Sequence, residues 1–549
     1  MWIENVLGAA DAVFQIKNLL LMTVGVLAGL IAGAIPGFTI TMAVVLTLPF
    51  TFALSPIEGL STMIGVFVGG LSGGLMSGVL TGIPGTPSSV ATTFDGFPMA
   101  RNGKPGLALG IGVWSSFAGG VLSAILLMAL APQLAKIGLE FGPNDYVALV
   151  LFALTITASL SGEQLLKGMI AGLLGLLLAT VGEDSVNGIE RLSFGVEALE
   201  SGFAFLPVLV GLFAFSQLMS DVANRDQARN RLMDAGTESV KVEHLAAIRE
   251  LVRNWAHLIR SSLIGAFTGI LPAAGGSISN ILAYDQAKKS DKHPEKFGTG
   301  TPAGIIASES ANNATAGGAL ITMMALGIPG DIVTAVMLGA LLIHDVVPSP
   351  SFIGEQPRLA YGIFIAFFFA NFLMLAVQSV ALRGFLLVTK ARMYLLASII
   401  LCFCAIGVFG LHNSIFDIWT MFLFGILGFA MRLLGFPLAP MILGVVLGPI
   451  AEVWLNRAVS SNPDLTLYFT RPWSLFFIIV AVFSVAFPWY QKARREDKAW
   501  ANWFMPALCL ALSVPLFMME GVARPILAGG LILLAGWLFL KTGKKLAGS

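Results

Sequence analysis

The chain has 549 residues, of which 56% are hydrophobic and 11% are charged, and its mean hydropathy is +0.85. This composition excludes a soluble globular protein and indicates an all-α protein that crosses a membrane many times. Lysine and arginine number 32 against 31 acidic residues, and the resulting net charge of +1 argues against a nucleic-acid partner. The 3 cysteines and 5 histidines have no disulfide or zinc spacing, so we expect no bound cofactor.

The N-terminal segment predicts a first membrane helix rather than a cleavable signal. Residues 1–17 contain Glu4 and Asp11 but only one basic residue, Lys17, so they lack a basic n-region. The apolar run over 18–34 is too long for the hydrophobic part of a signal peptide.

Apolar segments recur along the whole chain. A helix needs about 20 residues to cross a bilayer, and several segments are shorter than this. The short ones surround Pro/Gly breaks, so we interpret them as half-helices or re-entrant hairpins and expect roughly 11–14 crossings. The segments are 18–35, 42–54, 57–80, 107–131, 144–160, 164–181, 203–219, 258–272, 273–284, 304–326, 330–344, 359–380, 393–411, 415–432, 437–451, 473–489, 504–519 and 525–540.

Basic residues gather in four polar stretches. The positive-inside rule places these stretches, and with them the C-terminus, in the cytoplasm. The stretches are 221–257, 285–303, 490–503 and the C-terminal residues from 541 onward.

The sequence Gly-Ile-Pro-Gly occurs twice within membrane-length apolar sequence, at 82–85 and at 327–330. Proline breaks a helix because it lacks an N–H donor and clashes with the preceding turn, and glycine permits the turn that follows. A bilayer tolerates broken backbone only where it faces protein or a water-filled cavity. Two breaks at matching places in two halves predict a transporter's substrate site near the membrane midplane.

An internal repeat relates the two halves through three pairs of motifs. The Gly-Ile-Pro-Gly pair has an offset of 245 residues. The other pairs are 33–36 with 269–272, at an offset of 236, and Pro207-x3-Gly211 with Pro440-x3-Gly444, at an offset of 233.

The loops of the two copies differ in charge, which bears on topology. Loop 285–303 of the second copy is rich in lysine, whereas its counterpart 55–59 has none, and this favours inverted repeats. We expect four regions: a first transmembrane repeat over 1–220, a cytoplasmic polar linker over 221–257, a second transmembrane repeat over 258–490 and extra C-terminal helices over 491–549.

Hydroxyl residues follow the first break. Serine and threonine form helix N-caps, so Pro84 and Pro87 end one half-helix and Ser88 or Ser89 begins the next. The free N–H groups and positive end of that second half-helix suit an anion, ideally a carboxylate. The alternative is a hinge packed against a neighbouring helix. We call the break and the turn after it, residues 82–89, the first tip. Its predicted substrate-binding residues are Gly82, Pro84, Gly85, Thr86, Ser88 and Ser89.

The second tip, residues 327–334, carries Asp331 where the first tip has Thr86. An ionised Asp331 would cap its own helix and repel a carboxylate, and it could attract a cation beside carbonyls freed by the break. We therefore predict that Gly330, Asp331 and Thr334 contribute to a site for a coupling Na⁺ or H⁺. The alternative is that Asp331 acts only as an N-cap.

A polar set precedes the second tip. Glu309, Asn312 and Asn313 lie three to four residues apart and share one helix face. A carboxyl group and two amides inside a membrane are costly and usually functional. We assign Glu309 and Asn313 to ion coupling and both asparagines to substrate binding, with polar packing between helices as the alternative.

Polar residues also follow the other pair of proline breaks. Thr39 follows Pro36, and Ser277 and Asn280 follow Pro272. We expect these three side chains to line the same substrate cavity. The alternative is that the small residues around them let helices pack closely.

Four short motifs carry a family resemblance. They are Gly82-Ile83-Pro84-Gly85 with Asp95-Gly96-Phe97-Pro98-Met99-Ala100; Glu309-Ser310-Ala311-Asn312-Asn313-Ala314; Gly327-Ile328-Pro329-Gly330; and Pro437-Leu438-Ala439-Pro440-Met441-Ile442-Leu443-Gly444. Together they resemble the large membrane subunit of the tripartite tricarboxylate transporters. The resemblance implies an ion-driven importer of small tri- or dicarboxylates in the bacterial inner membrane. It also implies two partners, a small membrane subunit and a periplasmic binding protein that delivers the substrate.

Two other functions remain open at this stage. Tyr284-Asp285 and the segment from Gly327 to Asp331 loosely resemble the paired motifs of intramembrane aspartyl proteases, which need two carboxyl groups in one site. A passive anion channel is the other alternative, although two unlike tips favour alternating access. The sequence leaves the substrate, the choice between Na⁺ and H⁺, and a homo-oligomeric state undecided.

Overall fold

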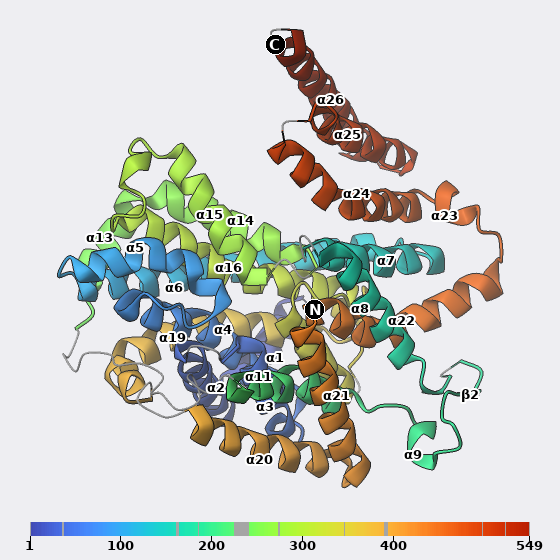
Figure 1. Cartoon of the computed structure of the whole chain (residues 1–549), viewed down its shortest axis with the longest axis horizontal. Helices are drawn as coiled ribbons and strands as arrows, with labels where there is room; N and C mark the ends of the chain where they lie inside the picture. The colour runs from blue at the N-terminus through green and yellow to red at the C-terminus, as the bar shows by residue number, and fades with distance from the viewer. Residues whose placement is uncertain are drawn as a thin grey trace. The chain divides into compact units, whose positions relative to one another are not determined.

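The computed structural model is almost entirely helical in the part of the chain that it describes (Figure 1). Within that part, nine helices are long and apolar enough to cross a membrane, which confirms a polytopic all-α membrane protein. Shorter apolar helices accompany them, so the predicted total of crossings stays a prediction. The described residues are 2–35, 38–160, 164–184, 186–223, 241–272, 275–344, 346–388, 393–496, 498–521 and 523–547.

The chain divides into two compact units. Unit 1 comprises Met1–Leu139 and Ala204–Ala430. Its helices are α1 (Trp2–Val13), α2 (Ile16–Ala34), α3 (Ile40–Thr51), α4 (Pro56–Thr81), η1 (Pro87–Ser89), α5 (Val90–Arg101), α6 (Pro105–Gly138), α10 (Phe205–Leu209), η3 (Val210–Phe215), α11 (Ser216–Ala223), α13 (His244–Arg253), α14 (Trp255–Ile270), α15 (Gly275–Ser290), η4 (Pro294–Lys296), α16 (Pro302–Leu326), α17 (Ile332–Ile343), α18 (Phe352–Glu355), α19 (Pro357–Val388), α20 (Met393–His412) and most of α21 (Ile415–Leu433).

Unit 2 comprises Glu140–Phe203 and Met431–Ser549. Its elements are α7 (Pro143–Leu160), α8 (Leu165–Ala179), the antiparallel strands β1 (Gly182–Glu183) and β2 (Glu190–Arg191), α9 (Glu197–Glu200), α22 (Leu438–Ser461), α23 (Leu467–Thr470), α24 (Pro472–Arg495), α25 (Ala501–Met518) and α26 (Ala523–Ala547).

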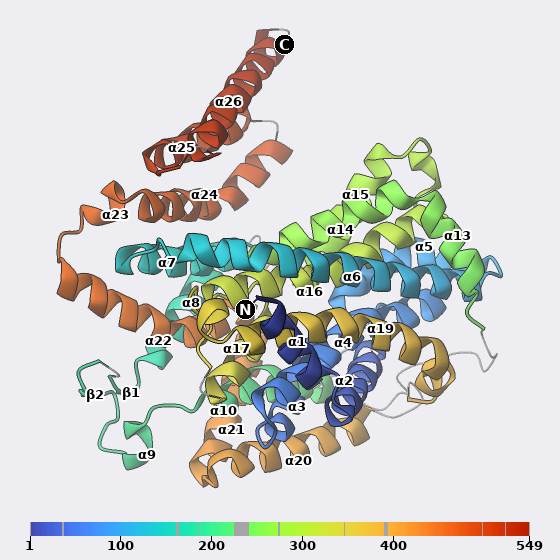
Figure 2. The ribbon, with the colours of Figure 1, turned by 180° about the vertical axis from the view of Figure 1, so that it is seen from behind.

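Helices α4 and α16 form the interior of unit 1. Nearly all of α4 is buried, and every residue of α16 from Ala303 to Ala325 is buried. Helix α4 is rich in Gly and Ser, and α16 is rich in Ala and Gly; these small residues let neighbouring backbones approach closely. Helices α14 and α15 lie beside α16 in both views of the molecule (Figures 1 and 2).

The first two pairs of motifs use glycines in the same way, and the repeat itself stays a prediction. A Cβ atom placed on Gly33 of α2 would lie 2.3 Å from the carbonyl oxygen of Gly70 on α4. A Cβ atom on Gly269 of α14 would lie 2.2 Å from the carbonyl oxygen of Thr315 on α16. Gly33 and Gly269 are 236 residues apart, and Gly70 and Thr315 are 245 residues apart. These are the same offsets that relate the motifs in the sequence.

The third motif pair also makes equivalent contacts, one in each unit. In unit 1, a Cβ atom on Gly211 would lie 2.5 Å from the carbonyl oxygen of Met421. In unit 2, a Cβ atom on Gly444 would lie 2.4 Å from the carbonyl oxygen of Gly172. Each copy therefore packs its glycine against a helix from the opposite half of the sequence.

The predicted linker over 221–257 is described only in part. Residues 224–240 lie outside the described ranges, as do Pro36 and Ala273 at the other proline breaks. The described end of the linker forms α13 and the start of α14. Helix α13 packs on α6, and the N–H of Glu243 donates to the carbonyl oxygen of Gly106 at 3.1 Å.

Candidate functional site

Each Gly-Ile-Pro-Gly sequence ends a buried helix, as its composition predicts. Gly82 after α4 has a φ of 76° and Gly327 after α16 has a φ of 72°, a left-handed conformation that glycine adopts without strain. Each tip then packs against an earlier helix, the first tip on α2 and the second tip on α14. A Cβ atom would lie 2.1 Å from the carbonyl oxygen of Gly33 if placed on Gly85, and 2.2 Å from that of Gly269 if placed on Gly330.

The first tip is held together by its own hydroxyl groups. The N–H of Thr86 donates to Ser89 Oγ at 3.3 Å, and Ser89 Oγ donates to the carbonyl oxygen of Thr86 at 2.9 Å. Thr86 Oγ1 and Ser88 Oγ share a hydrogen bond of 3.1 Å. These three hydroxyl groups, predicted to bind substrate, therefore form a cap for η1 and α5. Ile83 above them is 51% exposed, whereas Thr86 is only 1% exposed.

The second tip is capped by Asp331. Its Oδ1 accepts the N–H and the hydroxyl of Thr334, both at 2.7 Å, while its own N–H donates to Thr334 Oγ1 at 3.0 Å. The N-cap that the sequence left as an alternative is thus present, and the predicted cation role of this residue stays a prediction. This tip is more deeply buried than the first: Ile328 is 4% exposed, and Gly327 packs against Pro348.

The two tips meet at the N-terminal turn of α15. A Cβ atom on Gly275 would lie 3.9 Å from Asp331 Cβ, and a Cβ atom on Gly276 would lie 2.9 Å from Ser88 Cβ. Ser277 follows in the same turn and is exposed. The starts of η1–α5, α15 and α17 therefore lie together, and with them the positive ends of these helices.

Asparagine side chains bind the backbone around the first tip. The Asn280 side-chain nitrogen on α15 donates to the carbonyl oxygen of Ser88. The Asn312 side-chain nitrogen on α16 donates to the carbonyl oxygen of Leu71 on α4 at 3.0 Å. Asn313 is also buried, and neither its oxygen nor its nitrogen has a hydrogen-bond partner within the described ranges.

Glu309 lies in the interior of unit 1, next to the half-helix of the first tip. Thr92 Oγ1 on α5 donates to its Oε1 at 2.5 Å, and Ser116 Oγ on α6 donates to its Oε2 at 2.8 Å. The side chain is fully buried and joins α5, α6 and α16. This arrangement is the interhelical polar packing that the sequence left open, and its predicted role in ion coupling is not decided by it.

Thr39 has a local role in the structure. It is the N-cap of α3, where its Oγ1 accepts the N–H of Met42 at 3.1 Å. Helix α3 packs on α4 and α17, so Thr39 belongs to the helix that supports the second tip.

Asp95 on α5 is a central residue to which the sequence interpretation gave no role of its own. Its Oδ1 accepts the N–H groups of Gly298, Gly300 and Thr301 at 2.9, 2.8 and 2.9 Å. Its Oδ2 accepts the hydroxyl of Tyr284 on α15 at 2.8 Å. The signal available in the sequence was an acidic residue in the segment that follows the first break. Asp95 fixes the first tip's half-helix to α15 and to the loop before α16.

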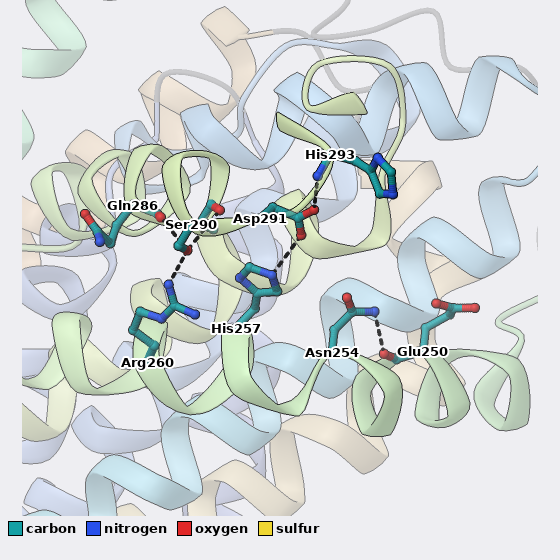
Figure 3. A network of polar contacts seen from close by, with 9 residues as sticks. Glu250, Asn254, His257, Arg260, Gln286, Ser290, Asp291 and His293 are labelled. Atoms are coloured by element: carbon teal, nitrogen blue, oxygen red, sulfur yellow. Dashed lines mark hydrogen bonds and ion pairs between the residues drawn. The ribbon is translucent and has the colours of Figure 1, made fainter. Parts of the chain in front are cut away.

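A second polar network closes the far end of the α14–α15 hairpin (Figure 3). His257 Nε2 lies 2.9 Å from Asp291 Oδ2, and Arg260 donates to Ser290 Oγ. Burial alone would raise the pKa of Asp291, but hydrogen bonds from the His293 N–H and from His257 bring it below its ordinary value. The network fixes the ends of α14 and α15, and α15 carries at its other end the turn that contacts both tips.

Two helix breaks that meet inside a bundle of mostly apolar helices are typical of a membrane transport protein. The family assignment agrees, since the tripartite tricarboxylate transporter TctA family matches residues 19–443. The chain belongs to this family. Its members are transporter components rather than enzymes, which rejects the aspartyl protease interpretation. Asp285 accordingly lies at the surface, in an ion pair with Lys289 at 2.5 Å, whereas Asp331 is buried.

Two proteins of Agrobacterium vitis are similar to this chain. One, described as an uncharacterized 52.8 kDa protein in the TAR-I ttuC' 3'region, is 33% identical over 493 residues, which cover 88% of this chain and 96% of the relative. The other, an uncharacterized protein in the TAR-II ttuC' 3'region, is 35% identical over 212 residues, which cover 38% of this chain and 86% of the relative. No solved structure matches the chain. The family is one of three-component transporters, so membership implies a small membrane subunit and a periplasmic binding protein.

Proposed function

We propose that this chain is the subunit that carries a small tri- or dicarboxylate across the bacterial inner membrane, into the cell, by ion-coupled alternating access. The observation that supports this most is the meeting of both broken tips at the N-terminal turn of α15. Free N–H groups and aligned helix dipoles at such ends stabilise an anion where water is excluded.

The anion belongs at the first tip and the α15 turn in this proposal. The start of α17 is already capped by the Asp331 side chain, whose carboxyl group would repel a carboxylate. The start of α15 begins with Gly275 and Gly276, which bring no side chain of their own to cap it. Carboxylate binding would therefore use backbone N–H groups of these turns, with the Ser277 and Ser88 hydroxyls and the Asn313 amide beside them.

The partners complete the transport cycle. A periplasmic binding protein hands the carboxylate to the membrane complex, and the small membrane subunit packs against this chain in the bilayer. The coupling ion is Na⁺ or H⁺, and the C-terminus lies in the cytoplasm, as the basic stretches indicate.

The test is uptake of labelled tri- and dicarboxylates into proteoliposomes that contain the whole membrane complex, with the binding protein added outside. We expect accumulation above the external concentration when a Na⁺ or proton gradient is imposed, and its collapse when an ionophore removes the gradient. Equilibration without accumulation would indicate a passive channel, and no uptake of any carboxylate would overturn the proposal.

A further inference from the structure

Two carboxamide oxygens near the first tip are buried without a hydrogen-bond donor among the described residues. They are Asn280 Oδ1 and Asn312 Oδ1. The orientation of each amide is fixed, because its nitrogen faces a main-chain carbonyl oxygen, which can only accept. Asn280 donates to Ser88 and Asn312 donates to Leu71. The acceptor oxygens must therefore be the atoms left unpaired.

Both amides lie around the N-terminal turn of α15. A Cβ atom on Gly276 would lie 2.7 Å from Asn312 Oδ1 and 2.9 Å from Ser88 Cβ. Asn280 lies one turn further along α15 and binds Ser88. Glycine at 276 therefore lets α15 approach Asn312 and Ser88 closely, since any side chain there would clash with both.

We propose that Asn280 Oδ1 and Asn312 Oδ1 are ligands of the coupling ion, and that this ion is Na⁺. The inference rests on the proposed function and deepens it. Two buried oxygen acceptors without donors among the described residues suit a hard cation, and a carboxamide does not take up a proton in the physiological range, which excludes H⁺ at these two atoms. A buried acceptor without a partner is destabilising, and a bound cation removes that cost.

This assignment moves the ion from the second tip to the first. The Asp331 carboxyl group, predicted from the sequence as a cation ligand, already accepts two hydrogen bonds from Thr334 through Oδ1. Na⁺ between α15, α16 and the first tip would lie next to the helix ends that suit the carboxylate. Because the cation and the anion attract each other, bound Na⁺ raises the protein's affinity for the carboxylate, and bound carboxylate raises its affinity for Na⁺ by the same factor.

The experiment measures the thermal unfolding of the purified complex of this chain with its small membrane subunit, without carboxylate. NaCl is compared with choline chloride and KCl at equal ionic strength. We expect Na⁺ alone to raise the unfolding midpoint in a saturable way, because a ligand that binds only the folded state stabilises it. Asn280→Ala and Asn312→Ala should each raise the half-saturating Na⁺ concentration about tenfold, as expected for the loss of one hydrogen-bonding partner of a charge.

Asn371→Ala is the matched control. Asn371 Oδ1 on α19 is also buried without a donor in the described part of the chain, and its nitrogen donates to the carbonyl oxygen of Phe367 at 2.7 Å. This variant should unfold at a lower temperature but keep the wild-type Na⁺ dependence. Should the alanine variants at the site fail to fold, Asn312→Asp keeps the oxygen ligand: it loses the hydrogen bond to Leu71 and should unfold at a lower temperature, but it should bind Na⁺ at least as tightly as the wild type.

Two results would overturn the inference: a wild-type complex without a Na⁺-specific shift, or wild-type Na⁺ dependence in both alanine variants at the site. Uptake assays separate this failure from that of the proposed function. Carboxylate accumulation driven by protons alone would leave the proposed function intact and remove the Na⁺ site. A Na⁺-dependent shift that the site variants abolish, together with no transport of any carboxylate, would support the Na⁺ site and overturn the proposed function.

Discussion

The Asp95 carboxyl group on α5 accepts the hydroxyl hydrogen of Tyr284 on α15 at 2.8 Å, in the interior of unit 1. The same carboxyl group accepts three backbone N–H groups from the loop before α16. A single side chain of the first repeat therefore holds two elements of the second. This contact determines where α15, with its N-terminal turn, lies relative to the first tip.

Asp95→Ala should destabilise the protein strongly, since it leaves three N–H groups and a hydroxyl without their acceptor. An unsatisfied buried donor costs about 1–3 kcal/mol, which applies to the Tyr284 hydroxyl, whereas the three N–H groups belong to exposed or half-buried loop residues and each cost less. Tyr284→Phe removes only the hydroxyl that donates to Asp95 and leaves the carboxyl group with its three N–H donors, so it should cost about 1–3 kcal/mol at most. Thermal unfolding of the purified variants measures both, and equal midpoints for the two variants would contradict the central role of Asp95.

Glu309→Gln should weaken the contact that joins α5, α6 and α16. Glutamine keeps one acceptor oxygen, so either Thr92 or Ser116 loses its partner, at a cost of about 1–3 kcal/mol. If Glu309 also takes part in ion coupling, the ion dependence of uptake should change more than the amount of folded protein. Thr92→Val is the control, because it removes the same hydrogen bond without touching the carboxyl group. The same ion dependence in both variants would leave Glu309 with a packing role only.

Gly85→Ala and Gly330→Ala should each prevent correct packing of a tip. The added Cβ atom would lie 2.1 Å or 2.2 Å from a main-chain carbonyl oxygen, and backbone cannot move aside as a side chain can. Gly410→Ala is the matched control, since a Cβ atom there meets nothing within 4 Å and alanine favours a helix by about 1 kcal/mol. Folded yield after membrane extraction measures the effect. Normal yield of both tip variants would show that the tips tolerate separation from α2 and α14.

Local signals predicted the parts of this structure that depend on local chemistry. The breaks at Pro84 and Pro329 and the cap at Asp331 follow from the backbone properties of proline, glycine and aspartate, and the structure has each of them. The paired motifs share glycines because close helix packing requires glycine at fixed places.

The partners of the buried acids were not predictable in the same way. Asp95 and Gly298 are 203 residues apart, and Thr92 and Glu309 are 217 residues apart. No pattern within one helix specifies which residue of another helix will reach it. For this reason the sequence suggested that Glu309 is functional without indicating that Thr92 and Ser116 bind it.

Pro84→Ala combined with Pro87→Ala should abolish uptake while the protein still inserts into the membrane. The double variant restores two N–H donors and removes the ring constraints that separate α4 from η1, so a continuous helix becomes accessible through the first tip. The N–H groups proposed to bind the carboxylate would then be used within that helix. Uptake by the reconstituted complex, with protease protection to check insertion, measures the outcome.

The control for this variant is Pro132→Ala, which changes a proline inside α6 and should leave uptake near the wild-type level. A second arm omits the periplasmic binding protein, which should stop uptake by the otherwise intact wild-type complex. Normal transport by the double proline variant would remove the first tip from the mechanism. Undiminished transport without the binding protein would instead contradict substrate delivery by that partner and leave the first tip's role intact, so the two arms test separate parts of the proposed mechanism.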